Sequence, residues 1–105
     1  MILKDGGECV TDFSLKFFRK NRDKLGRIVK IEIQKRTDEK GEWNQHPFRI
    51  VDHKGNQLWL SGCQSGYGGE GPYGAHQVLQ ELGVNVDFEE IKKKESIVID
   101  VLARG

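Results

Sequence analysis

Alternating apolar and polar positions mark the clearest strands of the chain. Val29, Ile31 and Ile33 alternate with polar residues, which is the two-residue period of a strand that buries one face. Residues 48–52 and 57–61 have comparable apolar runs, and a short polar segment containing glycine joins them. We therefore expect these three segments to form an antiparallel meander.

A fourth strand is expected near the end of the sequence. Ile97, Ile99 and Val101 alternate with residues that include Val98 and Leu102, so this run is apolar on nearly both faces. Strands that are buried on both faces have this composition, and they lie in the middle of a sheet. The pattern therefore predicts a central C-terminal strand.

Apolar residues at helical spacing predict a helix before the meander. Leu15, Phe18 and Leu25 lie on one helical stripe, although residues 13–17 also alternate as in a strand. We favour the helix, because Gly26 follows Leu25 at the position where many helices end in a left-handed turn.

Two more helices are expected after the meander. Apolar residues recur at helical spacing from Ala75 to Leu82, Pro72 suits the first turn, and Gly83 suits the position after the last one. A short helix is expected to begin at Asp87, a residue type that often caps helices.

Together these elements predict an α+β fold. Its antiparallel sheet has about four strands, the meander plus the C-terminal strand, and it packs against two or three helices. The expected core consists of Val29, Ile31, Ile33, Leu58, Leu60, Ala75, Val78, Leu79, Leu82, Ile97, Ile99 and Val101.

Length and composition fit one domain that spans residues 1–105, with 36% hydrophobic and 31% charged residues. No run approaches the ~20 apolar residues of a membrane span, and the first ten residues lack the apolar core of a signal peptide. We therefore expect a cytoplasmic protein without membrane contact. Two cysteines are too few for a disulfide scaffold.

Charge is distributed unevenly along the chain. Residues 1–54 carry 13 Lys or Arg against 9 Asp or Glu, a net charge of +4, while the remaining residues carry 4 against 7, a net of −3. Most of the positive excess lies between Lys16 and Lys30. This basic segment is the basis of one alternative hypothesis, a module that binds protein or nucleic acid. Nucleic acid is disfavoured as a partner, because the whole chain has a net charge of only +1.

Six glycines occur within residues 62–74, between the third expected strand and the following helix. A glycine-rich loop before a helix can direct backbone N–H groups at an anion, and glycine lets a ligand approach the main chain closely. Tyr67 and Tyr73 offer aromatic faces for a base. This loop is therefore the leading candidate for a phosphate site.

Known nucleotide-loop signatures are incomplete here. Gly66, Gly68 and Gly71 match the spacing of the dinucleotide fingerprint, but the βαβ context that gives it meaning is absent. The phosphate-loop pattern fails because Ala75 and His76 occupy the positions of its lysine and hydroxyl residue.

Cysteine chemistry is the third hypothesis. Cys63 precedes the loop and His76 lies in the helix after it, so a thiolate and an imidazole could meet as in a cysteine hydrolase. A lone cysteine after an apolar strand is more often a small buried hydrophobe, and this hypothesis is therefore disfavoured. The histidines and cysteines show no zinc-ligand spacing, and Trp43 and Trp59 are expected to pack in the core or on a sheet face.

These observations predict a non-catalytic module that sequesters or senses a phosphate-bearing small molecule such as a nucleotide. It needs no catalytic residue, metal or cofactor, and self-association is left open. The expected ligand contacts are Gly66, Tyr67, Gly68, Gly69, Gly71, Tyr73, Gly74, His76 and Arg49.

Overall fold

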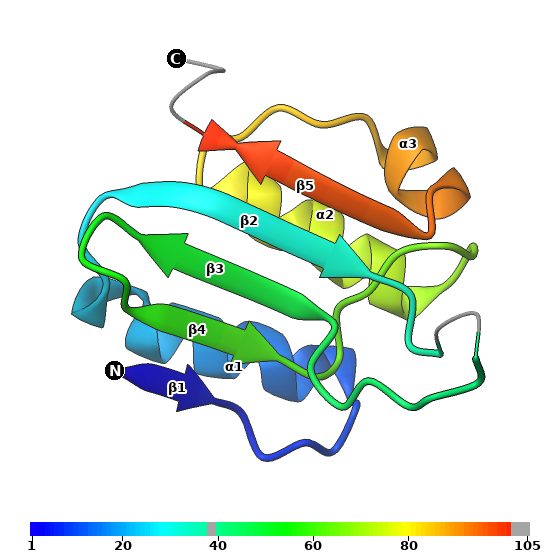
Figure 1. Ribbon diagram of the computed structural model, residues 1–105, viewed down its shortest axis with the longest axis horizontal. Coiled ribbons are helices and arrows are strands. Elements are labelled where there is room, and N and C mark those ends of the chain that lie inside the picture. Colours follow the sequence, from blue (N-terminus) through cyan, green and yellow to red (C-terminus); the bar gives the residue numbers. More distant parts are fainter. Residues whose placement is uncertain (38–39, 102–105) are drawn as a thin grey trace.

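The computed structural model describes residues 1–37 and 40–101 (Figure 1). Within these residues a five-stranded sheet has the order β1-β4-β3-β2-β5. The strands are β1 (Ile2–Lys4), β2 (Ile28–Gln34), β3 (Phe48–Asp52), β4 (Gln57–Leu60) and β5 (Ser96–Asp100). The helices are α1 (Thr11–Asn21), α2 (Glu70–Glu81) and α3 (Phe88–Lys93), and the 3-10 turn η1 (Arg22–Lys24) follows α1.

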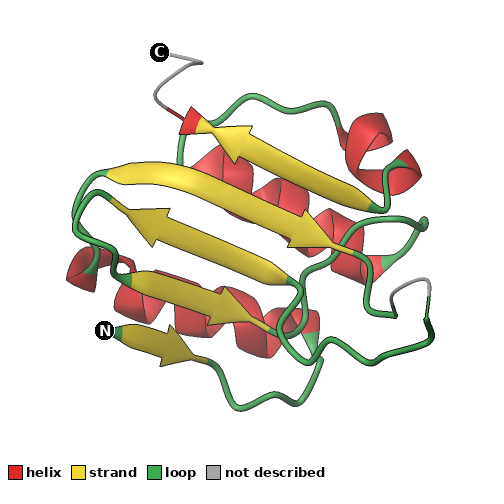
Figure 2. Ribbon diagram, in the orientation of Figure 1, coloured by secondary structure: helices red, strands yellow, loops and turns green. Residues whose placement is uncertain are grey.

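The α+β class and the antiparallel meander are confirmed. β2 pairs with β3 and β3 pairs with β4, in both cases antiparallel. One strand was not expected, because β1 has only three residues. It pairs with β4 in the parallel direction, which makes the sheet mixed. The helices α1 and α2 lie on one face of the sheet, behind it in Figures 1 and 2. We call the other side the open face.

The prediction of a central C-terminal strand is wrong. β5 pairs with β2 along one side and forms an edge of the sheet. Its side chains alternate, with Ile97 and Ile99 buried and Val98 65% exposed on the open face. The apolar composition of this run therefore includes a solvent-exposed valine. Leu102 lies outside the described residues.

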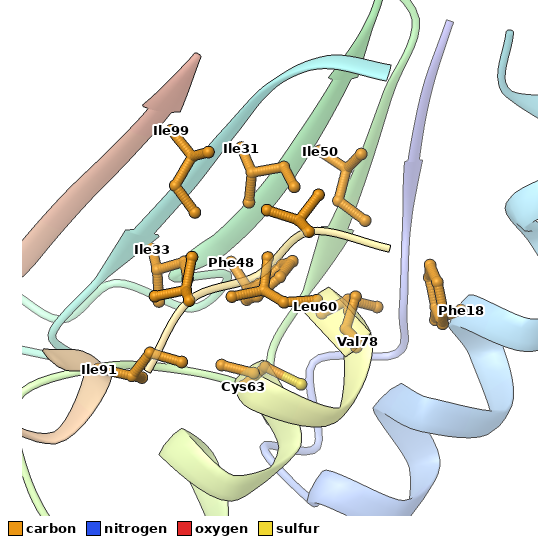
Figure 3. Packing of buried hydrophobic residues seen from close by; sticks show 14 of the residues in the cluster. Phe18, Ile31, Ile33, Phe48, Ile50, Leu60, Cys63, Val78, Ile91 and Ile99 are labelled. Carbon is orange, nitrogen blue, oxygen red and sulfur yellow. The ribbon is translucent and has the colours of Figure 1, made fainter. Parts of the chain in front are cut away.

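The core lies between the sheet and the helices (Figure 3). Most of the expected core residues are buried, among them Ile31 and Ile33 of β2. Val29 is an exception, because the pairing of β2 with β3 shifts register between Ile28 and Lys30, and Ile28 packs against the core instead. Leu82 and Val101 are only partly buried.

The helix ends follow the expectations in part. Gly83 has a φ of 76° just after α2, and the Asp87 side chain caps α3 by accepting a hydrogen bond from the Glu89 amide. The prediction of a left-handed turn at Gly26 is wrong, because the chain leaves η1 in an extended conformation at Leu25. None of the described helices is long and apolar enough to cross a membrane.

Candidate functional site

The glycine loop, residues 62–74, is packed against its own chain. A Cβ atom on Gly62 would lie 2.5 Å from the Val10 carbonyl, and one on Gly74 would lie 2.5 Å from the Thr11 side chain. A Cβ atom on Gly71 would lie 2.6 Å from the Gln64 side chain. Several glycines are therefore required by close packing inside the protein.

Its two tyrosines differ in their surroundings. The Tyr67 ring lies against Gly69, where a Cβ would be 2.5 Å away, and its hydroxyl accepts a hydrogen bond from Gln64 Nε2 at 3.2 Å. Tyr73 lies in the first turn of α2 and is 58% exposed. Tyr67 thus helps to shape the loop although it is 45% exposed, and Tyr73 faces solvent.

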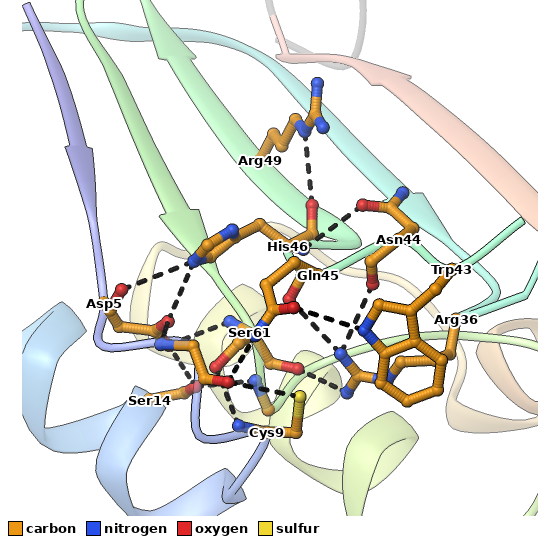
Figure 4. Close-up of polar contacts among 12 residues, drawn as sticks. Asp5, Cys9, Ser14, Arg36, Trp43, Asn44, Gln45, His46, Arg49 and Ser61 are labelled. Atoms are coloured by element: carbon orange, nitrogen blue, oxygen red, sulfur yellow. Dashed lines mark hydrogen bonds and ion pairs between the residues drawn. The ribbon is translucent and has the colours of Figure 1, made fainter.

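The nine predicted ligand residues do not converge on one point. Gly66, Tyr67, Gly68, Gly69, Gly71, Tyr73 and Gly74 lie in the loop and at the start of α2, as expected. His76 contacts the ring of Phe88 on α3, with 5.7 Å between the ring centres. Arg49 is in β3 and lies on the open face, on the side of the sheet opposite α2 (Figure 4).

The thiol of Cys63 is unsuited to nucleophilic catalysis. Its side chain is fully buried in the core. Burial, together with the charge of Asp5, raises the pKa of Cys63 far above that of an ordinary thiol. The thiolate that a cysteine hydrolase requires is therefore disfavoured here.

The basic segment, residues 16–30, is partly neutralised by α2. Arg19 forms hydrogen bonds and an ion pair with Glu81 at 2.8 Å, and Arg22 approaches the same carboxylate at 4.0 Å. These contacts join α1 to α2, so part of the predicted basic surface acts in helix packing.

A groove lies on the open face of the sheet, where the segment between β2 and β3 meets the strands. Its volume is about 700 Å³, within the range of small-molecule sites. Both tryptophans of the chain line it, together with the basic side chains of Lys4, Lys35 and Arg49, the imidazole of His46 and the side-chain amides of Gln34, Asn44 and Gln45. Its lining also includes the carboxylates of Glu42 and Glu95. We call it the open-face groove.

Sheet register places Trp59 between two cations. Lys4 of β1 and Arg49 of β3 are the direct cross-strand neighbours of Trp59 on β4. The ammonium nitrogen of Lys4 lies 4.8 Å from the centre of the indole ring, and the guanidinium carbon of Arg49 lies 3.8 Å from it. Cations at these distances are attracted by the electron-rich ring face.

The two cations beside Trp59 form no ion pair within the described part of the chain, although Glu32 of β2, which pairs with Lys30 at 2.6 Å, is the cross-strand neighbour of Arg49. Lys35, also in the groove, lies 3.5 Å from the Glu95 carboxylate. Arg49 donates one hydrogen bond to the His46 carbonyl at 3.2 Å, which orients its side chain. The groove therefore places two cations, of which Arg49 is oriented by a hydrogen bond, against an aromatic wall.

Trp43 provides a second, exposed aromatic surface. It is 61% exposed, and the guanidinium of Arg36 lies 5.2 Å from its ring centre. The packing predicted for both tryptophans therefore holds for Trp59, which lies on the sheet face, while Trp43 projects from the segment between β2 and β3 (Figure 4).

A buried carboxylate anchors the wall of the groove. Asp5 accepts hydrogen bonds from the Ser14 hydroxyl at 2.6 Å and the Ser61 amide at 2.8 Å, and His46 Nε2 lies 3.2 Å from its other oxygen (Figure 4). Burial by itself raises the pKa of Asp5, but the hydrogen bonds from Ser14, Ser61 and Gly7 outweigh burial and lower it. Asp5 thus ties β1, α1 and the loop of His46 together.

Sequence reasoning missed this groove, apart from Arg49. Its residues are distant in sequence and meet through the parallel pairing of β1 and the fold of the segment between β2 and β3. One signal was present: in a hairpin joined by residues 53–56, Arg49 and Trp59 fall on outward positions and face each other.

No group of three His, Cys, Asp or Glu side chains among the described residues is arranged to hold a metal ion. Comparison of the chain with protein-family models, curated proteins and solved structures finds no match.

Proposed function

We propose that this protein is a non-catalytic binding module that holds a nucleotide in the open-face groove. The observation that carries the proposal is the pair of cations beside Trp59. Lys4 and Arg49 lie within 5 Å of one indole ring and have no ion-pair partner among the described residues. Positive charge that forms no ion pair among the described residues is suited to a phosphate group.

The rest of the groove suits the base of a nucleotide. Trp43 offers an exposed ring, and stacking on such a ring contributes roughly 1–3 kcal/mol per base. The side-chain amides of Asn44 and Gln45 can donate to and accept from the edge of a base. An aromatic, phosphate-bearing ligand therefore uses both ends of the groove.

His46 has a positioning role in this proposal. It lies against Asp5, and that contact holds the wall of the groove in place. The proposal therefore includes binding and no chemical step.

The glycine loop remains the competing location for the same ligand chemistry. Its glycines have a packing explanation, since Cβ atoms at Gly62, Gly71 and Gly74 would collide with the protein itself. The groove combines an exposed tryptophan, Trp43, with two cations that form no ion pair among the described residues. We therefore favour the groove.

Tryptophan fluorescence gives a direct test, because both tryptophans of the chain line the groove. We would titrate the protein with AMP, ATP, GMP and cyclic AMP, and with adenosine and tripolyphosphate as half-ligands. A nucleotide should change the emission at saturation, and each half-ligand should bind at least about ten-fold more weakly.

Variants then locate the site. Arg49→Gln, Lys4→Gln and Trp43→Ala should each weaken nucleotide binding about ten-fold or more, whereas Lys16→Gln, an exposed change on α1, should leave it unchanged. Loss of binding in Tyr73→Ala with normal binding in Arg49→Gln would move the site to the glycine loop. If no nucleotide changes the emission or the melting temperature at millimolar concentration, the proposed function is wrong.

A further inference from the structure

β5 has one unpartnered edge. It pairs with β2 on one side, and no described strand pairs with its other side. The Lys35 amide donates a hydrogen bond to the Glu95 carbonyl. Because hydrogen-bonded and non-hydrogen-bonded pairs alternate along an antiparallel ladder, Ile97 and Ile99 are the residues of β5 whose N–H and C=O groups bond to β2. The N–H and C=O groups of Ser96 and Val98 therefore point away from β2.

Within the described residues, this edge lacks the lysine, proline and bulge that protect many edge strands, and its one charged residue is Asp100. Proteins guard exposed edges with short strands, lysine, proline or bulges. The opposite edge of this sheet follows that rule, since β1 has three residues and ends at Lys4. β5 has five residues, contains no lysine, arginine or proline, and pairs with β2 without a bulge.

The side chain in the middle of β5 is also unusual. Val98 is 65% exposed, the highest value among the large hydrophobic residues that the structure describes. An exposed β-branched residue at the centre of an open edge is suited to a cross-strand partner.

We propose that β5 pairs antiparallel with β5 of a second copy of this chain, about a twofold axis at Val98. This register places Val98 opposite Val98 of the partner subunit and Ser96 opposite Asp100 of the partner subunit, so no like charges face each other. The backbone groups that point outward from Ser96 and Val98 are those that such a pair uses.

The pairing is isologous and therefore closes on itself as a dimer. Because the twofold axis is perpendicular to the joined sheets, the open faces of both copies lie on the same side of one continuous sheet. The helices of both copies cover the other side.

Sedimentation equilibrium from micromolar to millimolar concentration tests the dimer. Val98→Lys places two like charges opposite each other, and Val98→Pro removes the outward N–H without removing a bond to β2. Both should raise the dimer dissociation constant about ten-fold or more, while Val98→Thr, of similar shape, should keep it within about three-fold. Circular dichroism checks that each variant is folded.

Cross-linking tests the register. Opposed residues of such a pair have Cα atoms about 5.5 Å apart, which a disulfide can span. In a Cys9→Ser background, Val98→Cys should give a disulfide-linked dimer on mild oxidation, and Ser96→Cys should not. A wild-type protein that stays monomeric at millimolar concentration, or a dimer that Val98→Pro does not weaken, would overturn the proposal.

Discussion

The guanidinium carbon of Arg49 lies 3.8 Å from the centre of the Trp59 ring, directly across the β3–β4 ladder. Lys4 lies across the other ladder, 4.8 Å from the same ring. Three strands are thus linked on the open face by side chains as well as by backbone bonds. This arrangement distinguishes the two tryptophans of the groove.

We expect Trp59→Ala to lower the free energy of unfolding by about 1–2 kcal/mol, because two cation–π contacts and cross-strand packing are lost. Trp43→Ala should change it by no more than about 0.5 kcal/mol, since this side chain is 61% exposed. Urea unfolding followed by circular dichroism measures both. Equal losses in the two variants would contradict the assignment of Trp59 to the sheet.

Two buried serines should behave differently. The Ser14 hydroxyl donates to Asp5 and accepts from the Gly62 amide, so Ser14→Ala leaves buried groups short of a partner and should cost about 1–3 kcal/mol. The Ser65 hydroxyl is buried and has no hydrogen-bond partner within the described part of the chain. Ser65→Ala should therefore be neutral within about 0.5 kcal/mol or stabilising. The same urea titrations compare them.

Glycine substitutions separate packing from ligand binding. Gly62→Ala places a methyl group 2.5 Å from the Val10 backbone and should destabilise the protein by about 2 kcal/mol or more in the absence of any ligand. Gly68→Ala meets only the flexible end of Lys92, 3.3 Å away, and should cost less than about 1 kcal/mol. Thermal melts without ligand measure the difference. A mild effect of Gly62→Ala would show that the contact with residue 10 relaxes easily.

Asp52 gives a prediction for acid pH. Burial raises its pKa, but hydrogen bonds from the Gly26 amide and from Asn56 and Lys54 outweigh burial and lower the pKa from 3.8 to about 2. The folded state therefore favours the carboxylate, and its stabilising effect is present above about pH 4 and is lost as the pH falls toward 2. The difference in the free energy of unfolding between the wild type and Asp52→Asn should therefore shrink as the pH falls from about 4 toward 2. Melting temperatures measured across this interval test this, and a constant difference would contradict the prediction.

The two thiols should react at different rates. Cys9 is partly exposed, whereas Cys63 is fully buried and its pKa is raised by burial. A thiol reagent should modify Cys9 in the folded protein and Cys63 only after unfolding. Mass spectrometry of digested, labelled protein assigns each site, with Cys9→Ser as the control that should leave the folded protein unlabelled. Rapid labelling of Cys63 would show that the core opens locally.

Local patterns in the sequence were sufficient for most elements of the fold. Alternation at Ile31 and Ile33, helical spacing from Ala75 to Leu82, and the glycine after α2 each reflect interactions between residues close in the chain. Such patterns identify which face of an element is buried, and they gave the α+β class and the meander.

Tertiary structure decided the order of strands at both edges and the position of the groove. β1 is too short to show an alternation of apolar and polar residues. Its pairing with β4 joins residues that are more than 50 positions apart in the sequence. The apolar run of β5 suggested a central strand, but whether a neighbour covers Val98 depends on the arrangement of the whole sheet. Lys4, Trp59 and Arg49 meet for the same reason: a strand's periodicity specifies which side a residue faces, while its neighbours follow from strand pairing, which the sequence pattern does not encode locally.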